Sequence, residues 1–196
     1  QKMRLRQKLV LEFWDRSKGL SVSNTSYRNF VIKFFSLLSV SDAENNDLTT
    51  NSLIDNDKKV SAFITAKEGG ILAGIEELKL LNKDLKIIQF KNDGSMIKNG
   101  DEILEMNGNA KTILQRERIN LNLLQRMCGT ATLAYDLNKK LKNRIKLAAT
   151  RKTLWWLLDK KAVSIGNGLT HRLSLSDGII IKDNHLKIIN CNFKKA

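Results

Sequence analysis

The chain has 196 residues, of which 42% are hydrophobic and 28% charged, and its formal net charge at pH 7 is +14. This is the composition of a globular protein with one large or two small domains, and it excludes a low-complexity chain. With no apolar run of bilayer-spanning length, no secretory signal and no Cys-x-x-Cys pair, we expect a cytoplasmic protein without a membrane partner.

The positive charge is compatible with nucleic acid, an acidic surface or small polyanions as a partner. Lysine is spread through every segment, and no block of five basic residues occurs. A dedicated nucleic-acid binder usually carries a basic stripe or arm, so the charge pattern does not favour that function.

Residues 1–27 form a basic N-terminal extension in which one helical face is apolar, followed by a Ser/Asn-rich break at 21–26. That face consists of Met3, Leu5, Leu9, Phe13 and Trp14. Residues 27–40 are densely apolar and predict a buried helix, which ends in a polar loop at 41–50.

In residues 60–107 the period of the hydrophobic pattern shortens towards two residues. The segments 60–65 and 85–90 alternate or run apolar as strands do, and a short helix interrupts them at 76–81. Asp93-Gly94 and Asn99-Gly100 are tight-turn signals. We predict an α+β sandwich domain over residues 28–115, built on an antiparallel sheet.

Residues 111–141 predict a helical segment with a break at Gly129. Arg118 lies within it. On its local pattern alone Arg118 is a solvated charge or a partner of Glu117 or Glu102.

The segment from residue 145 onwards predicts a right-handed strand, helix, strand unit. Residues 145–150 and 178–181 are short apolar runs typical of strands in a parallel sheet, and residues 154–162 have helical spacing between them. Ligands of such sheets and barrels bind at the carboxyl ends of the strands. Basic side chains follow both runs, so we expect them to converge on an anionic ligand.

Six side chains make up this basic group: Arg151, Lys152, His171, Arg172, Lys182 and His185. A metal site is not favoured, because the two histidines have cationic neighbours and no carboxylate cluster accompanies them. Asp177 and Asp183 are interpreted as orienting acids, and Trp155 and Trp156 as core or interface aromatics.

The motifs of this region occur in a family order. They are T-R-K-T at 150–153, A-V at 162–163 with a glycine-containing loop at 166–168, H-R-x-x-L-x-D at 171–177 and I-K-D-N-H at 181–185. Upstream stand D-L-T-T at 47–50, A-K-E-G-G-I-L-A-G at 66–74, and E-R-I-N-L-N-L-L-Q-R at 117–126 running into G-T-A-T at 129–132. With these motifs, the sequence resembles the quinolinate phosphoribosyltransferases, also called carboxylating nicotinate-nucleotide pyrophosphorylases.

The resemblance implies an α/β fold: the α+β sandwich domain, then linker helices and the first strands of an α/β-barrel catalytic domain over residues 116–196. It also implies phosphoribosyl transfer from phosphoribosyl pyrophosphate to quinolinate with decarboxylation, giving nicotinate mononucleotide, CO2 and pyrophosphate in NAD biosynthesis. Mg²⁺ would accompany the phosphoribosyl pyrophosphate.

The resemblance assigns roles to seven residues. Arg151 and Arg172 would clamp the carboxylates, joined by Arg118 from the neighbouring subunit of a homodimer or higher oligomer with shared active sites. The others, Lys152, His171, Lys182 and His185, would meet a carboxylate or the sugar phosphates, with Lys152 and Lys182 as the catalytic lysines.

Two kinds of departure from the family pattern stand out. Trp156 and Asn167 occupy positions where many members have glycine. The chain also ends at Ala196, before the family's later barrel strands, so we expect a C-terminally truncated member whose activity alone stays an open question. The alternatives are a related phosphoribosyltransferase acting on another anionic ring and, less favoured, a basic nucleic-acid-binding protein.

Overall fold

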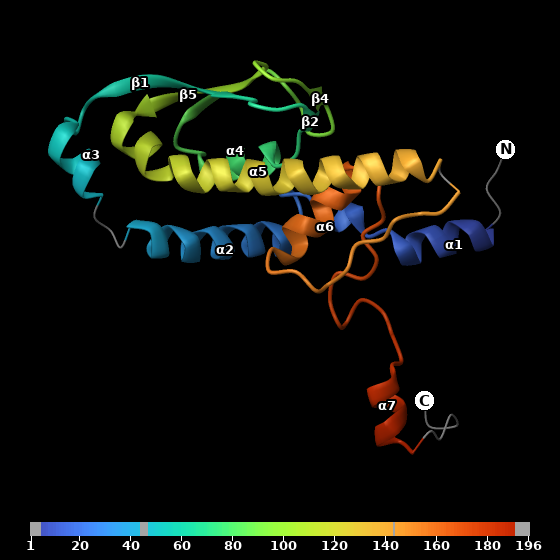
Figure 1. Cartoon of the computed structure of the whole chain (residues 1–196). Helices are drawn as coiled ribbons and strands as arrows, with labels where there is room; N and C mark the ends of the chain where they lie inside the picture. The colour runs from blue at the N-terminus through green and yellow to red at the C-terminus, as the bar shows by residue number, and fades with distance from the viewer. Residues whose placement is uncertain (1–4, 44–46, 143, 191–196) are drawn as a thin grey trace.

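One long helix, α5 (Ala110–Lys140), runs through the centre of the molecule, with a curved sheet on one side and helices on the other (Figure 1). This computed structural model describes residues 5–43, 47–142 and 144–190. Met3 and part of the predicted loop at 41–50 lie outside the described residues. The expected mixture of helix and sheet is confirmed. Most of the other helices and strands pack against α5.

The sheet over α5 is antiparallel, as the alternating segments predict. It consists of β1 (Lys59–Thr65), β3 (Lys86–Gln89) and β5 (Glu102–Asn109) in the order β1-β5-β3, with Ala62 opposite Met106. A second, two-stranded sheet pairs β2 (Gly70–Ile71) with β4 (Met96–Ile97). Both predicted turns form: Gly94 and Gly100 have φ of 84° and 87°, values that glycine adopts without steric cost.

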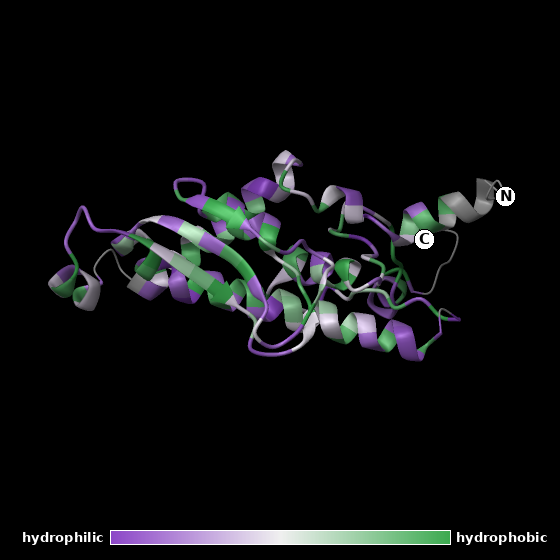
Figure 2. Cartoon of the chain, turned by 90° about the horizontal axis from the view of Figure 1, so that it is seen from above, coloured by the Kyte–Doolittle hydropathy of each residue, from purple (hydrophilic) through white to green (hydrophobic). Residues whose placement is uncertain are grey.

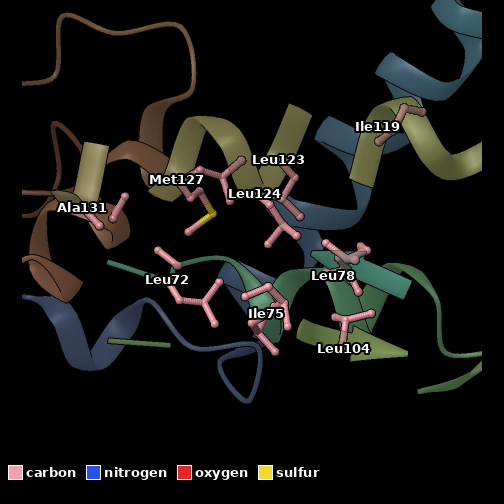
Figure 3. Close-up of a cluster of buried hydrophobic side chains, with 14 of the residues drawn as sticks. Leu72, Ile75, Leu78, Leu104, Ile119, Leu123, Leu124, Met127 and Ala131 are labelled. Atoms are coloured by element: carbon pink, nitrogen blue, oxygen red, sulfur yellow. The ribbon is translucent and has the colours of Figure 1, made fainter. Parts of the chain in front are cut away.

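The core lies between α5 and the layer formed by the strands and α4 (Ile75–Leu81), the predicted short helix (Figure 3). One face of α5 is buried because its apolar residues recur at helical spacing: Ile119, Leu123, Leu124, Met127 and Ala131. Leu72, Ile75, Leu78 and Leu104 meet this face from the other side. Each large side chain that is fully buried here contributes about 1.5–3 kcal/mol to stability.

The N-terminal segment is helical: α1 (Leu5–Trp14), a 3-10 turn at Ser17–Gly19, and α2 (Thr25–Ala43). The prediction of a buried helix at 27–40 is correct for one face only. Tyr27, Val31 and Phe35 are buried, whereas Leu37 and Val40 are exposed. Helix α3 (Leu48–Leu53) follows, with Asp47 as its N-cap.

Hydrophilic residues interrupt the hydrophobic ones along the long helices (Figure 2). Within the described part of the chain, no helix has the length and apolarity that a membrane crossing requires.

The prediction of barrel strands at 145–150 and 178–181 is wrong. Both ranges are fully described, and neither forms a strand; Ile145 and Ile179 are 65% and 87% exposed. A strand needs a hydrogen-bonded neighbour along its length, and here the first run pairs only through a single parallel bridge between Ala148 and Leu169. The intervening helix does form, as α6 (Trp156–Ile165), and α7 (Asp183–Ile188) lies away from the body at the end of the chain (Figure 1).

The predicted break at Gly129 is also wrong, because α5 continues through it. Gly129 is exposed, and a Cβ there would meet nothing within 4 Å. Gly166, at the end of α6, is different: a Cβ there would lie 2.2 Å from the carbonyl oxygen of Ala131. The backbone of α6 therefore packs directly against α5 at this glycine.

We expect Gly166→Ala to destabilise the protein by about 1–3 kcal/mol, because the added methyl group overpacks a contact with rigid backbone. Gly129→Ala is the matched control and should stabilise the protein by about 0.5–1 kcal/mol, because alanine loses less conformational entropy in a helix. Urea unfolding of both variants measures these changes. Equal effects of the same sign would contradict the close approach of α6 to α5.

Candidate active site

A pocket of about 450 Å³ lies where the segment after α6 approaches the loop before it. Four of the predicted basic side chains line it: Arg151, Arg172, Lys182 and His185. The remaining lining residues come from 175–189 and are apolar, apart from the backbone. The pocket lining therefore combines cationic side chains with apolar ones, a combination that suits a flat anionic ring.

The two arginines of the pocket have donors that the protein leaves unused. Arg172 is 7% exposed and donates from Nη1 to the carbonyl oxygen of Gly178 at 2.6 Å. The Nε atoms of Arg151 and Arg172 are both buried without a hydrogen-bond partner in the described structure. A buried donor without a partner costs about 1–3 kcal/mol, more for a charged group, so this arrangement favours an anionic ligand.

Trp156 lies beside Arg151 and has an unusual backbone. The Arg151 guanidinium lies over the indole at 5.4 Å from its centroid, within the range of a cation-π contact. Trp156 has φ of 45° and Asn167 has φ of 65°, both in the left-handed region that favours glycine. The resemblance implies glycine at both positions, and glycine adopts such a backbone conformation without steric cost.

The N-terminal segment holds the H-R-x-x-L-x-D motif in place. The backbone N–H of His171 donates to the carbonyl oxygen of Trp14 at 2.7 Å, and the two rings stack at 4.6 Å. Arg16 donates to Asp177 at 3.0 Å, and Asp177 also accepts from the backbone N–H of Leu173. Asp177 is thus an orienting acid, as predicted, and its partner is Arg16 of the extension, which sequence reasoning left without a role.

His171 is part of this packing and is not among the residues that line the pocket. Burial lowers the pKa of its imidazole, and the nearby cations Lys160, Arg172 and Arg16 lower it further. The neutral ring is therefore the favoured form, which is consistent with its stack on Trp14.

Like His171, two further predicted residues do not line the pocket. Lys152 is exposed and does not line it. Arg118 lies in a separate hollow of about 630 Å³ that residues of α5 line together with Asp42, Asp47 and Leu48, and its side chain is 75% exposed. Its ion-pair partner is Asp42 at 3.4 Å, and the suggested partners Glu117 and Glu102 are wrong.

Sequence reasoning missed two buried lysines of α6. Lys160 is 1% exposed and donates to the carbonyl oxygens of Ala149 and Thr170. Lys161 is 8% exposed and pairs with Glu76 and Glu77 of α4. A signal was present, since both lysines stand between Leu158 and Ala162 on a helix with apolar spacing, where a lysine needs a partner.

The residues described here do not supply a resident metal site. No group of three or more His, Cys, Asp or Glu side chains within them lies close enough together to hold an ion. The donors of the pocket are cations and one imidazole, which attract anions rather than Mg²⁺.

The structure mixes α and β elements and contains a pocket lined by four basic side chains. The family comparison is more specific: residues 47–128 match the quinolinate phosphoribosyl transferase N-terminal domain and residues 130–196 match its C-terminal domain. The chain belongs to the quinolinate phosphoribosyltransferase family.

Similar proteins agree with this assignment. The probable carboxylating nicotinate-nucleotide pyrophosphorylases of Methanothermobacter thermautotrophicus and Bacillus subtilis are 40% and 41% identical to the chain, over 73% and 74% of its length. These matches cover 54% and 52% of the relatives, so the chain spans about half their length.

Solved structures show the same likeness. The nicotinate-nucleotide pyrophosphorylase from Francisella tularensis has a TM-score of 0.74 at 31% identity and covers 85% of this chain and 62% of its own. The enzyme from Ehrlichia chaffeensis has a TM-score of 0.72 at 31% identity, covering 82% of this chain and 60% of its own.

Proposed function

We propose that the chain takes part in carboxylating nicotinate-nucleotide synthesis, with quinolinate and phosphoribosyl pyrophosphate as substrates. The observation that carries this proposal is the pocket in which Arg151 and Arg172 keep unused buried donors, in a chain of this family. Quinolinate carries two adjacent carboxylates on a flat ring. Two arginines can bind such carboxylates bidentately, a geometry that lysine does not offer.

The proposed reaction has two steps. The ring nitrogen forms a bond to the anomeric carbon of the ribose while the bond from that carbon to pyrophosphate breaks. The cationic pyridinium then accepts the electron pair of the bond to the 2-carboxylate, CO2 leaves, and the ring carbon takes a proton from water. The products are nicotinate mononucleotide, pyrophosphate and CO2.

The protein's part in this chemistry is electrostatic. Two anionic substrates repel each other, and preorganised cations in a partly desolvated site offset that repulsion. Lys182 and His185 line the pocket and are exposed, so a phosphate could approach them, and His185 Nδ1 accepts from the backbone N–H of Lys182 at 3.0 Å. Lys152 is placed to join them only if its exposed side chain turns inward on binding.

Magnesium and a second subunit complete the proposal. Mg²⁺ would arrive bound to the phosphates of phosphoribosyl pyrophosphate, since the described residues offer no site of their own. Arg118 is exposed and lies outside the pocket, which supports a role in the site of a neighbouring copy of the chain in a homodimer or higher oligomer. Cys128 is a free thiol, which suits a cytoplasmic setting.

The test of this proposal is a product assay with each ring substrate in turn. We expect quinolinate labelled in its 2-carboxyl group to release labelled CO2 and form nicotinate mononucleotide when phosphoribosyl pyrophosphate and Mg²⁺ are present. Nicotinate, which lacks the 2-carboxylate, should give no product. Nucleotide formation from nicotinate at the same rate would contradict the proposal and favour a related transferase that acts on another anionic ring.

A further inference from the structure

Lys160 is 1% exposed, and no acidic side chain among the described residues is its hydrogen-bond partner. Its Nζ donates to the carbonyl oxygen of Ala149 at 3.2 Å and to that of Thr170 at 2.5 Å. Ala149 stands two residues before Arg151, and Thr170 stands two residues before Arg172. One ammonium group therefore joins the two backbone segments that carry the pocket's arginines.

Backbone contacts between the Arg151 segment and the Arg172 segment lie around one point. A single parallel bridge connects Ala148 with Leu169, supported by hydrogen bonds from Ala149 N–H to the Leu169 oxygen and from Leu169 N–H to the Leu147 oxygen, both at 2.8 Å. Between this bridge and the arginines, no further bridge joins the described residues of the two segments. The Lys160 contacts lie at that end, between the bridge and the pocket.

We propose that Lys160 is a positioning residue of the pocket, which sets the spacing of Arg151 and Arg172 by holding the Ala149 and Thr170 carbonyl groups together. This inference rests on the proposed function, in which the two arginines bind the adjacent carboxylates of one ring. A dicarboxylate gains from both arginines only when their separation matches its own, and a monocarboxylate does not need that match.

The electrostatics of the site agree with this role. Burial lowers the pKa of Lys160 to about 8, with Arg151 and Arg172 lowering it and Asp177 opposing them. His171, whose own pKa Lys160 lowers, also faces this cluster. An arrangement that keeps a third cation beside two arginines is costly in the absence of a ligand, and an anion in the pocket would offset that cost.

The adjacent lysine provides a matched control. Lys160 and Lys161 are consecutive, both buried in α6, and Lys161 pairs with α4 on the other side, away from the arginine segments. We expect Lys160→Met to weaken quinolinate binding by about 10- to 100-fold while nicotinate binding changes less, so that the ratio of the two affinities falls. Lys161→Met should keep that ratio even though it lowers stability. Calorimetric titration at a temperature where all three proteins are folded measures both affinities.

An unchanged ratio in Lys160→Met would overturn the inference while leaving the proposed function intact. If Lys160→Met does not fold, Lys160→Gln replaces it, because glutamine retains a donor for one carbonyl group and should give an intermediate ratio. A second measurement, made without ligand, tests the positioning role of Lys160 independently of quinolinate binding. The ¹⁵N-¹H resonances of the Arg151 and Arg172 Nε–H groups should shift and exchange faster in the Lys160 variant than in the Lys161 variant, and unmoved resonances would refute positioning whether or not the chain binds quinolinate.

Discussion

Replacing Lys161 by methionine should destabilise the protein by about 3–5 kcal/mol, because the change leaves a buried carboxylate without its cation. The Lys161 ammonium contacts Glu76 and lies 2.5 Å from Glu77 Oε1, and the Glu77 side chain is fully buried. Tyr27 donates to the same oxygen at 2.7 Å, and within the described part of the chain the other oxygen of Glu77 has no hydrogen-bond partner. The loss would be a large part of the 5–15 kcal/mol by which a domain is typically stable.

The pH dependence of this variant gives a second readout. Burial raises the pKa of Glu77, while Lys161 and Tyr27 oppose the rise, so losing Lys161 should raise it further. A carboxyl group with a raised folded-state pKa destabilises the fold above that pKa, and stability returns as pH falls through it. Lys161→Met should therefore regain part of its loss as the pH falls from neutral towards the ordinary pKa of a glutamate.

A double variant tests whether the charge itself is the cause. Lys161→Met with Glu77→Leu removes both buried charges and should recover most of the loss, since an apolar pair of similar volume often replaces a buried ion pair at little cost. Lys79, exposed on the outer side of α4, serves as the control: Lys79→Met should change stability by less than about 0.5 kcal/mol. A wild-type melting temperature for Lys161→Met would contradict the buried pairing.

Local patterns predicted the first half of the fold well, because each element there has its own periodicity and turn chemistry. The strand at 60–65 alternates, and the Asp93-Gly94 and Asn99-Gly100 turns have glycine at positive φ. The local pattern did not predict that α5 continues through Gly129. A glycine within a helix lowers local propensity by only about 1 kcal/mol, and packing of α5 on the sheet exceeds that.

The second half shows what periodicity cannot supply. Residues 145–150 and 178–181 are apolar enough for strands, but strand formation depends on a paired neighbour, which no local pattern specifies. Four of the seven predicted site residues nevertheless line one pocket: Arg151 comes from the loop before α6, Arg172 from the loop after it, and Lys182 and His185 from the start of α7. The role of Arg16 depends on its contact with Asp177, 161 residues away in the sequence, and the role of Lys160 on its contact with Ala149, 11 residues away. Only the folded structure shows these two contacts.

Arg172→Met should remove most quinolinate binding and change the stability of the free protein only slightly. Losing an arginine that pairs with a carboxylate in a desolvated site costs about 2–5 kcal/mol of binding, or roughly 30- to several-thousand-fold in affinity. In the free protein Arg172 donates to the Gly178 carbonyl oxygen, while Asp177 pairs with Arg16, so the replacement strands no carboxylate. Arg116, an exposed partner of Asp84, is the control, and Arg116→Met should bind quinolinate as the wild type does.

The most direct test of the central claim is a calorimetric titration of the wild-type chain and Arg172→Met with quinolinate and with nicotinate. If the pocket with Arg151 and Arg172 is a dicarboxylate site, the wild type binds quinolinate more tightly than nicotinate, and Arg172→Met loses that preference while its melting temperature without ligand stays close to that of the wild type. Equal affinity of the wild type for both rings, or an unchanged preference in a folded Arg172→Met, would contradict the assignment of this pocket.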